Sequence, residues 1–179
     1  MYLWIGIDVD EQVQLVKESV HKIEQIIHFE HSNFTLPFHV SLKITFHVED
    51  NLVPQVLEDI IDLLQSTQPF VIPVLGYELE DTIAWLRMAP CPYLEEIHDK
   101  LNRMLLERYG VPLHPYDTDY KFHTTLFMSE DPKKVVSALA LVQDTLPPTE
   151  IAVNKFLLGS SQTGALGTFA VTHEVPMCG

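Results

Sequence analysis

The chain has 179 residues, of which 46% are hydrophobic and 20% charged, a composition typical of one globular domain or of two small lobes that share a core. Its 25 acidic and 11 basic residues give a formal net charge of −14, which repels long polyanions and argues against a duplex nucleic-acid binder. The two cysteines, Cys91 and Cys178, have no CxxC spacing, so we expect neither a disulfide framework nor a zinc knuckle. No apolar run is long enough to span a membrane, and we expect a cytoplasmic protein.

Helix-like and strand-like segments alternate along the chain. Strands are predicted where residues alternate with period two, and helices where apolar residues recur at spacings of three and four. Asp131 and Pro132 suit the start of a helix, and Gly110 suits the end of one. In chain order we expect a strand at 2–8, a helix at 10–28, a strand at 38–48, a helix at 51–66, strands at 69–79 and 82–89, a helix at 92–109, a strand at 120–128, a helix from 131 to about 144, and strands at 150–158 and 167–175. This order predicts an α+β fold.

Two of these strands carry one polar face each. Alternate side chains of a strand point to opposite sides, so the polar residues of 38–48 share a face that lies opposite an apolar one. That polar face contains His39, Ser41, Lys43, Thr45 and His47. The corresponding face of 120–128 contains Lys121, His123 and Thr125. Since such a face is not buried in an apolar core without partners, we expect it to face water, another polar strand or a ligand.

The two polar strands belong to an internal repeat. The segment Phe38-His39-Val40-Ser41-Leu42 recurs as Phe122-His123-Thr124-Thr125-Leu126. In both halves an acidic pair and a predicted helix follow, and then two strand runs, the second of which contains Trp85 in one half and Phe169 in the other. We infer two similar lobes whose polar strand faces meet in a central cleft.

At these residues the sequence resembles the 2H phosphoesterase superfamily, whose mark is two His-x-Ser/Thr-hydrophobic motifs, one in each lobe. It looks most like the branch of bacterial 2′-5′ RNA ligases and RNA 2′,3′-cyclic phosphodiesterases. The first motif covers residues 39–42, with Ser41 where threonine is commoner, and the second covers residues 123–126. The resemblance implies that residues 1–179 form a single α+β domain with two pseudo-symmetric lobes of antiparallel sheet, helices packed outside them and the motifs in a cleft between them.

Two histidines across a cleft suit phosphodiester chemistry. An imidazole pKa near 6.5 lets one ring accept a proton while the other donates one. We therefore interpret His39 and His123 as the acid–base pair, with Ser41 and Thr125 donating hydrogen bonds to phosphate oxygens. The resemblance implies that His123 is the base and His39 the acid, although the nearly symmetric motifs leave this open. No metal ion or other cofactor is expected.

Further candidates for binding the substrate are Lys43, Lys121, Tyr120 and Arg87. Either lysine can add positive potential near a phosphate or be a solvated strand cation. Arg87 shares a strand face with Trp85, and it either reaches the cleft or pairs with an acid. An aromatic side chain can stack on a base, which makes Phe34, Phe38 and Tyr120 candidates, with core packing the alternative for Phe38.

We expect a metal-independent phosphodiesterase that acts on nucleotide or oligonucleotide 2′,3′-cyclic phosphates or on related 2′-5′ phosphodiesters. RNA ligation is formally the reverse reaction. The expected partner is a nucleotide or a short RNA end, and the protein is expected to be a monomer. Two alternatives stay open, a non-catalytic nucleotide- or phosphate-binding module of the same fold and an acidic scaffold for a protein partner.

Overall fold

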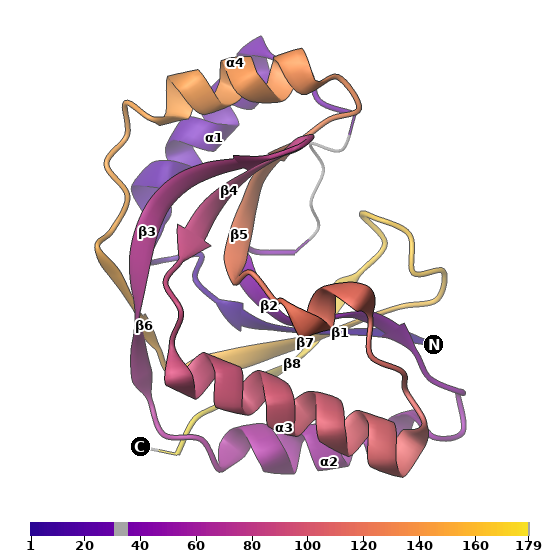
Figure 1. Ribbon diagram of the computed structural model, residues 1–179. Helices are drawn as coiled ribbons and strands as arrows, with labels where there is room; N and C mark the ends of the chain where they lie inside the picture. The colour runs from indigo at the N-terminus through magenta and orange to yellow at the C-terminus, as the bar shows by residue number, and fades with distance from the viewer. Residues whose placement is uncertain (31–35, 179) are drawn as a thin grey trace.

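A computed structural model describes residues 1–30 and 36–178 of the chain (Figure 1). Its elements are β1 (Tyr2–Asp8), α1 (Gln14–Ile26), β2 (His39–His47), α2 (Val53–Gln65), β3 (Phe70–Glu80), β4 (Ile83–Met88), α3 (Pro92–Tyr109), the 3₁₀-helix η1 (Pro115–Thr118), β5 (His123–Met128), α4 (Pro132–Val142), β6 (Glu150–Val153), β7 (Lys155–Ser161) and β8 (Ala170–Pro176). The predicted mixture of helices and strands is confirmed.

The strands form two antiparallel sheets of four strands each. Their orders are β2-β1-β7-β8 in one sheet and β5-β4-β3-β6 in the other. Figure 1 shows α1 and α4 on the outside of the sheet that contains β5, and α2 and α3 on the outside of the sheet that contains β2. The two-lobe α+β fold expected from the sequence is therefore confirmed.

Each sheet combines strands from both halves of the chain, which differs from the arrangement inferred from the repeat. β1 and β2 pair into a sheet with β7 and β8, whereas β4 and β5 share a sheet with β3 and β6. The expected strand at 150–158 is in fact two strands, β6 and β7, which part at Asn154 and enter different sheets. The strand beside each motif strand is consequently the one that precedes it in the chain, β1 beside β2 and β4 beside β5.

Helix ends follow local chemistry at two of the expected positions. α3 ends at Gly110, whose φ of 67° is a left-handed conformation that glycine adopts without the steric penalty of a Cβ atom. α4 begins after Asp131, whose carboxylate accepts a hydrogen bond of 3.0 Å from the Lys133 backbone N–H.

The first helix starts at Gln14, later than the sequence suggested. The side chain of Asp10 accepts a 2.9 Å hydrogen bond from the Phe38 N–H and forms an ion pair with Lys17. Asp10 therefore ties the beginning of β2 to the turn before α1 instead of capping that helix.

The apolar faces of the helices and sheets form one continuous core through both lobes. A smaller cluster of Trp4, Leu157 and Phe169 lies apart from it. In the described part of the chain, no helix has the combination of length and apolar character that crossing a bilayer requires.

Candidate active site

The two motifs lie on the facing edges of the two sheets. β2 is the edge strand of one sheet and β5 the edge strand of the other, and the two strands contact each other. His39 is the first residue of β2, and His123 is the first residue of β5. The repeat seen in the sequence thus brings the motif strands together where the lobes meet.

The same backbone hydrogen bond orients both imidazoles. His39 Nδ1 lies 2.7 Å from the Pro37 carbonyl oxygen, and His123 Nδ1 lies 2.6 Å from the Lys121 carbonyl oxygen. Because a carbonyl oxygen only accepts, Nδ1 carries the proton in each ring. Nε2 of each neutral ring is then the atom that can take up a proton from a ligand.

Each imidazole also packs against a tryptophan of the preceding strand. The ring centroids of Trp4 and His39 are 4.3 Å apart in an edge arrangement, and those of Trp85 and His123 are 3.8 Å apart in a stacked one. Trp4 is therefore the structural counterpart of Trp85, and the equivalence of Trp85 with Phe169 suggested by the repeat is wrong. Phe169 instead packs against Trp4.

The residue opposite each histidine on the neighbouring strand differs in charge. Asp8 of β1 pairs in register with His39, and Arg87 of β4 pairs in register with His123. Lys155 Nζ lies 2.8 Å from Asp8 Oδ2. The two histidines thus have the same backbone geometry, but the residue opposite His39 is negatively charged and the residue opposite His123 is positively charged.

Burial lowers the pKa of both histidines. For His39, burial is the largest cause, opposed by the carbonyl that Nδ1 contacts and by the negative charge of Asp8. Burial likewise lowers the pKa of His123, to about 4; the carbonyl at Nδ1 and Glu80 oppose this effect, while the charges of Arg87 and His39 add to it. The influence of His39 on His123 places the two rings within range of each other's charge.

The hydroxyl groups of the motifs lie close to the same aromatic residues. Trp4 Nε1 donates a hydrogen bond of 3.0 Å to Ser41 Oγ, which leaves the Ser41 proton available to an acceptor. Thr125 pairs in register with Trp85 on β4. The Trp85 Nε1 atom is buried and has no hydrogen-bond partner in the described part of the chain.

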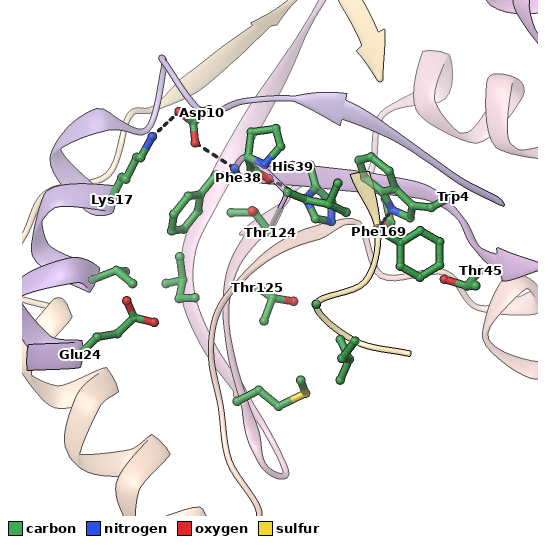
Figure 2. A pocket seen from close by; sticks show the side chains of 18 of the residues that line it. Trp4, Asp10, Lys17, Glu24, Phe38, His39, Thr45, Thr124, Thr125 and Phe169 are labelled. Carbon is green, nitrogen blue, oxygen red and sulfur yellow. Dashed lines mark hydrogen bonds and ion pairs between the residues drawn. The ribbon is translucent and has the colours of Figure 1, made fainter. Parts of the chain in front are cut away.

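A cavity of about 510 Å³ opens beside the motifs. His39, Ser41 and Thr125 line it together with α1 and the segment before β8 (Figure 2). His123 is not part of this lining, although it lies on the same strand as Thr125, two residues earlier. The cavity thus contains the first motif and the hydroxyl of the second.

Lys43 does not lie on the open polar face that the sequence suggested. Its side chain is only 2% exposed and forms an ion pair with the fully buried Asp117 of η1. The register of β1 and β2 shifts between Leu3 and Ile5 and again between Ile5 and Gly6, so strict alternation along β2 is lost. The interpretation of Lys43 as a substrate-binding residue is therefore wrong for this structure.

The other candidate binding residues have partners within the protein. Lys121 Nζ lies 2.9 and 3.0 Å from the carboxylate oxygens of Glu80. Arg87 Nε lies 3.5 Å from Glu78 Oε2, so Arg87 both pairs with an acid and adjoins His123. None of these side chains lines the cavity.

Tyr120 is partly buried and lies near the first motif. Its ring centroid lies 4.8 Å from that of His98, and its hydroxyl is close to the Ser41 side chain. Burial is the main reason why the pKa of Tyr120 is raised. Phe38 packs against the hydrophobic core and also lines the cavity, whereas Phe34 lies outside the described residues.

Sequence reasoning assigned no role to Trp4, Asp8 or Asp117. Trp4 and Asp8 lie in the opening strand, and their importance depends on β1 pairing with β2, a pairing that no local pattern reveals. Asp117 lies in the 3₁₀-helix before β5, and its burial with Lys43 follows from tertiary packing. Within residues 1–30 and 36–178, no group of three or more His, Cys, Asp or Glu side chains is arranged to hold a metal ion.

A family model described as the 2′-5′ RNA ligase superfamily matches residues 12–165. No curated protein sequence matches the chain significantly.

Three solved structures show the same fold at low sequence identity. TT0787 of Thermus thermophilus is 18% identical, with a TM-score of 0.66 and coverage of 98% of this chain and 97% of that one. E. coli LigT in complex with 3′-AMP is 18% identical, with a TM-score of 0.54 and coverage of 98% and 96%. Kluyveromyces marxianus Usb1 is 13% identical, with a TM-score of 0.51 and coverage of 98% and 97%.

Proposed function

The chain belongs to the 2′-5′ RNA ligase superfamily, and we propose that it is a phosphodiesterase that hydrolyses nucleotide or oligonucleotide 2′,3′-cyclic phosphates, or related 2′-5′ phosphodiesters, without a metal ion. The observation that carries the proposal is the matched pair of histidines on facing edge strands. In each ring Nδ1 is bound to a backbone carbonyl, so Nε2 is the atom that exchanges protons with a substrate.

In the proposed reaction, water attacks the phosphorus of the cyclic phosphate while His123 Nε2 takes up a proton of that water. The new P–O bond forms as the bond to one ribose oxygen breaks, and His39, which begins as the imidazolium with a proton on both ring nitrogens, donates its Nε2 proton to the departing oxygen. Ser41 and Thr125 donate hydrogen bonds to the other phosphate oxygens, on which negative charge increases. The product is a nucleoside monophosphate, and each histidine ends in the protonation state opposite to the one in which it began.

The charges opposite the two histidines support this assignment of roles. Asp8 favours the protonated form of His39, as a proton donor requires. Arg87 favours the neutral form of His123, as a proton acceptor requires. The motif sequences alone do not distinguish the two roles, and the charges of these two neighbours are what supports the proposed assignment.

Complexes of a protein with a similar fold support a nucleotide ligand. LigT of E. coli has been crystallised with 3′-AMP, with ATP and with NADP+. We propose that the present protein also takes a nucleotide or a short RNA end, with its phosphate beside His39, Ser41 and Thr125.

Turnover of the four nucleoside 2′,3′-cyclic phosphates in EDTA tests the proposal. The wild-type protein should hydrolyse at least one of them, and His39→Ala and His123→Ala should each lose roughly 10²–10⁴-fold in kcat while remaining folded. Binding of a nucleotide without any turnover would replace the proposal with a binding module, and wild-type rates in both variants would make the histidines structural.

A further inference from the structure

The cavity beside the motifs extends well past the catalytic groups. Figure 2 shows His39 and Thr125 near its centre and Glu24 of α1 on the side away from Trp4. Its volume of about 510 Å³ lies within the range of sites that hold ligands larger than a phosphate ion. A phosphate beside His39 therefore leaves room for the rest of a nucleotide to extend toward α1.

Part of the cavity wall is apolar and includes an aromatic ring. Phe38, Leu126 and Met128 contribute to it. A flat heteroaromatic ring buries its faces favourably against such side chains, and an aromatic neighbour adds a stacking contribution. This part of the cavity suits a nucleobase better than it suits a second phosphate or a sugar.

The α1 end presents a carboxylate whose hydrogen-bonding capacity is unused. Glu24 reaches from α1 toward the middle of the cavity (Figure 2). No hydrogen bond or ion pair engages its carboxylate in the part of the chain that the structure describes, and the nearby Lys17 is already paired with Asp10. Partial burial raises the pKa of Glu24, and the charge of His21 opposes this effect.

An ionised carboxylate has two oxygens that accept hydrogen bonds and none that donates. Among the four RNA bases, only guanine presents two adjacent N–H donors on one edge, at N1 and N2. Adenine and cytosine present one amino group beside an acceptor, and uracil presents one N–H between two acceptors. Glu24 thus matches guanine and leaves an unsatisfied or repelled acceptor opposite each of the other bases.

We propose that Glu24 selects guanine, so that the preferred substrates are guanosine 2′,3′-cyclic phosphate and RNA ends that terminate in it. This inference rests on the proposed function, because it assumes that the phosphate binds beside His39. Glu24 binds the base and does not take part in the proton transfers.

The test compares kcat/KM for the four nucleoside 2′,3′-cyclic phosphates in the wild type and in Glu24→Gln. We expect the wild type to prefer the guanosine compound by roughly 10- to 100-fold, the worth of a charged bidentate hydrogen bond. In Glu24→Gln one donor and one acceptor replace two acceptors, which matches the donor-beside-acceptor edges of adenine, cytosine and uracil and no longer matches the two donors of guanine. The variant should therefore lose the preference for guanosine and hydrolyse the other three compounds faster relative to it, a change that a general loss of stability does not produce.

Glu18→Gln is the matched control, since Glu18 lies on the same helix, is exposed and does not line the cavity. It should retain the wild-type preference. Similar rates for all four substrates in the wild type, or an unchanged preference in Glu24→Gln, would overturn the inference and leave the proposed phosphodiesterase activity standing. Failure of the wild type to hydrolyse any of the four would overturn both.

Discussion

Removing the positive charge opposite His123 should have a predictable effect on the pKa of that histidine. Arg87→Met keeps most of the length and packing of the arginine stem and removes its positive charge. Because the positive charge of Arg87 contributes to the low pKa of His123, about 4, the variant should raise that pKa. The pKa of His39 should change much less, since Arg87 is paired in register with His123 and not with His39.

The size of the change follows from the register of the two strands. Directly opposed residues have Cβ atoms about 5 Å apart, which puts a guanidinium group on the order of 7 Å from the opposite ring. At that separation two charges interact by about 2 kcal/mol at an effective dielectric constant of 20, equivalent to more than one pH unit. Glu78 Oε2 lies 3.5 Å from Arg87 Nε and offsets part of the field. We therefore expect the pKa of His123 to rise by about one unit.

Titration of the imidazole ring signals by NMR measures this value in the free protein, whether or not a given variant is active. Arg108→Met is the matched control, because Arg108 lies at the end of α3 and pairs with Asp59. It should leave the pKa of His123 unchanged. A pKa of His123 that stays the same or falls in Arg87→Met would refute the electrostatic basis for making His123 the base.

Three further results are expected. In Asp8→Asn the pKa of His39 should fall further, which would move the alkaline limb of the kcat/KM profile to lower pH; a limb that stays in place would contradict the role of Asp8. In Lys43→Met the buried carboxylate of Asp117 loses its cation, so the free energy of unfolding measured in urea should fall by about 3–5 kcal/mol. The double variant Lys43→Met/Asp117→Asn should recover most of this loss, and equal stability of the single and double variants would count against the buried pair. A substrate with a good leaving group needs little protonation on departure, so it should rescue His39→Ala far more than His123→Ala, and the reverse pattern would exchange the two roles.

The parts of the fold that depend on local patterns could be predicted from the sequence. Alternation of polar and apolar residues identified the strands that carry His39 and His123, because one face of each is exposed to a cleft. The cap at Asp131 and the left-handed Gly110 follow from preferences of single residues. The pairing of the two motifs followed from their repetition in similar surroundings.

Strand partners and departures from regular alternation could not be predicted, since both depend on residues distant in the sequence. The apolar pattern of 150–158 is continuous, although the chain changes sheets at Asn154. The register shifts of β2 against β1 turned Lys43 into the interior, where Asp117 neutralises it. The positions of Asp8 and Arg87 opposite the two histidines follow from the order and register of the strands, which the sequence does not reveal.

The most direct test of the account is the pH dependence of kcat/KM for hydrolysis of a nucleoside 2′,3′-cyclic phosphate by the wild-type protein in EDTA. The acidic limb should report His123, near its pKa of about 4, and the alkaline limb should report His39 and lie below the usual histidine value, since burial lowers the pKa of both rings. A bell-shaped profile with those two limbs, unaffected by EDTA, is the predicted result. Absence of hydrolysis, loss of activity in EDTA, or a rate that does not vary across this range would contradict catalysis by the two histidines.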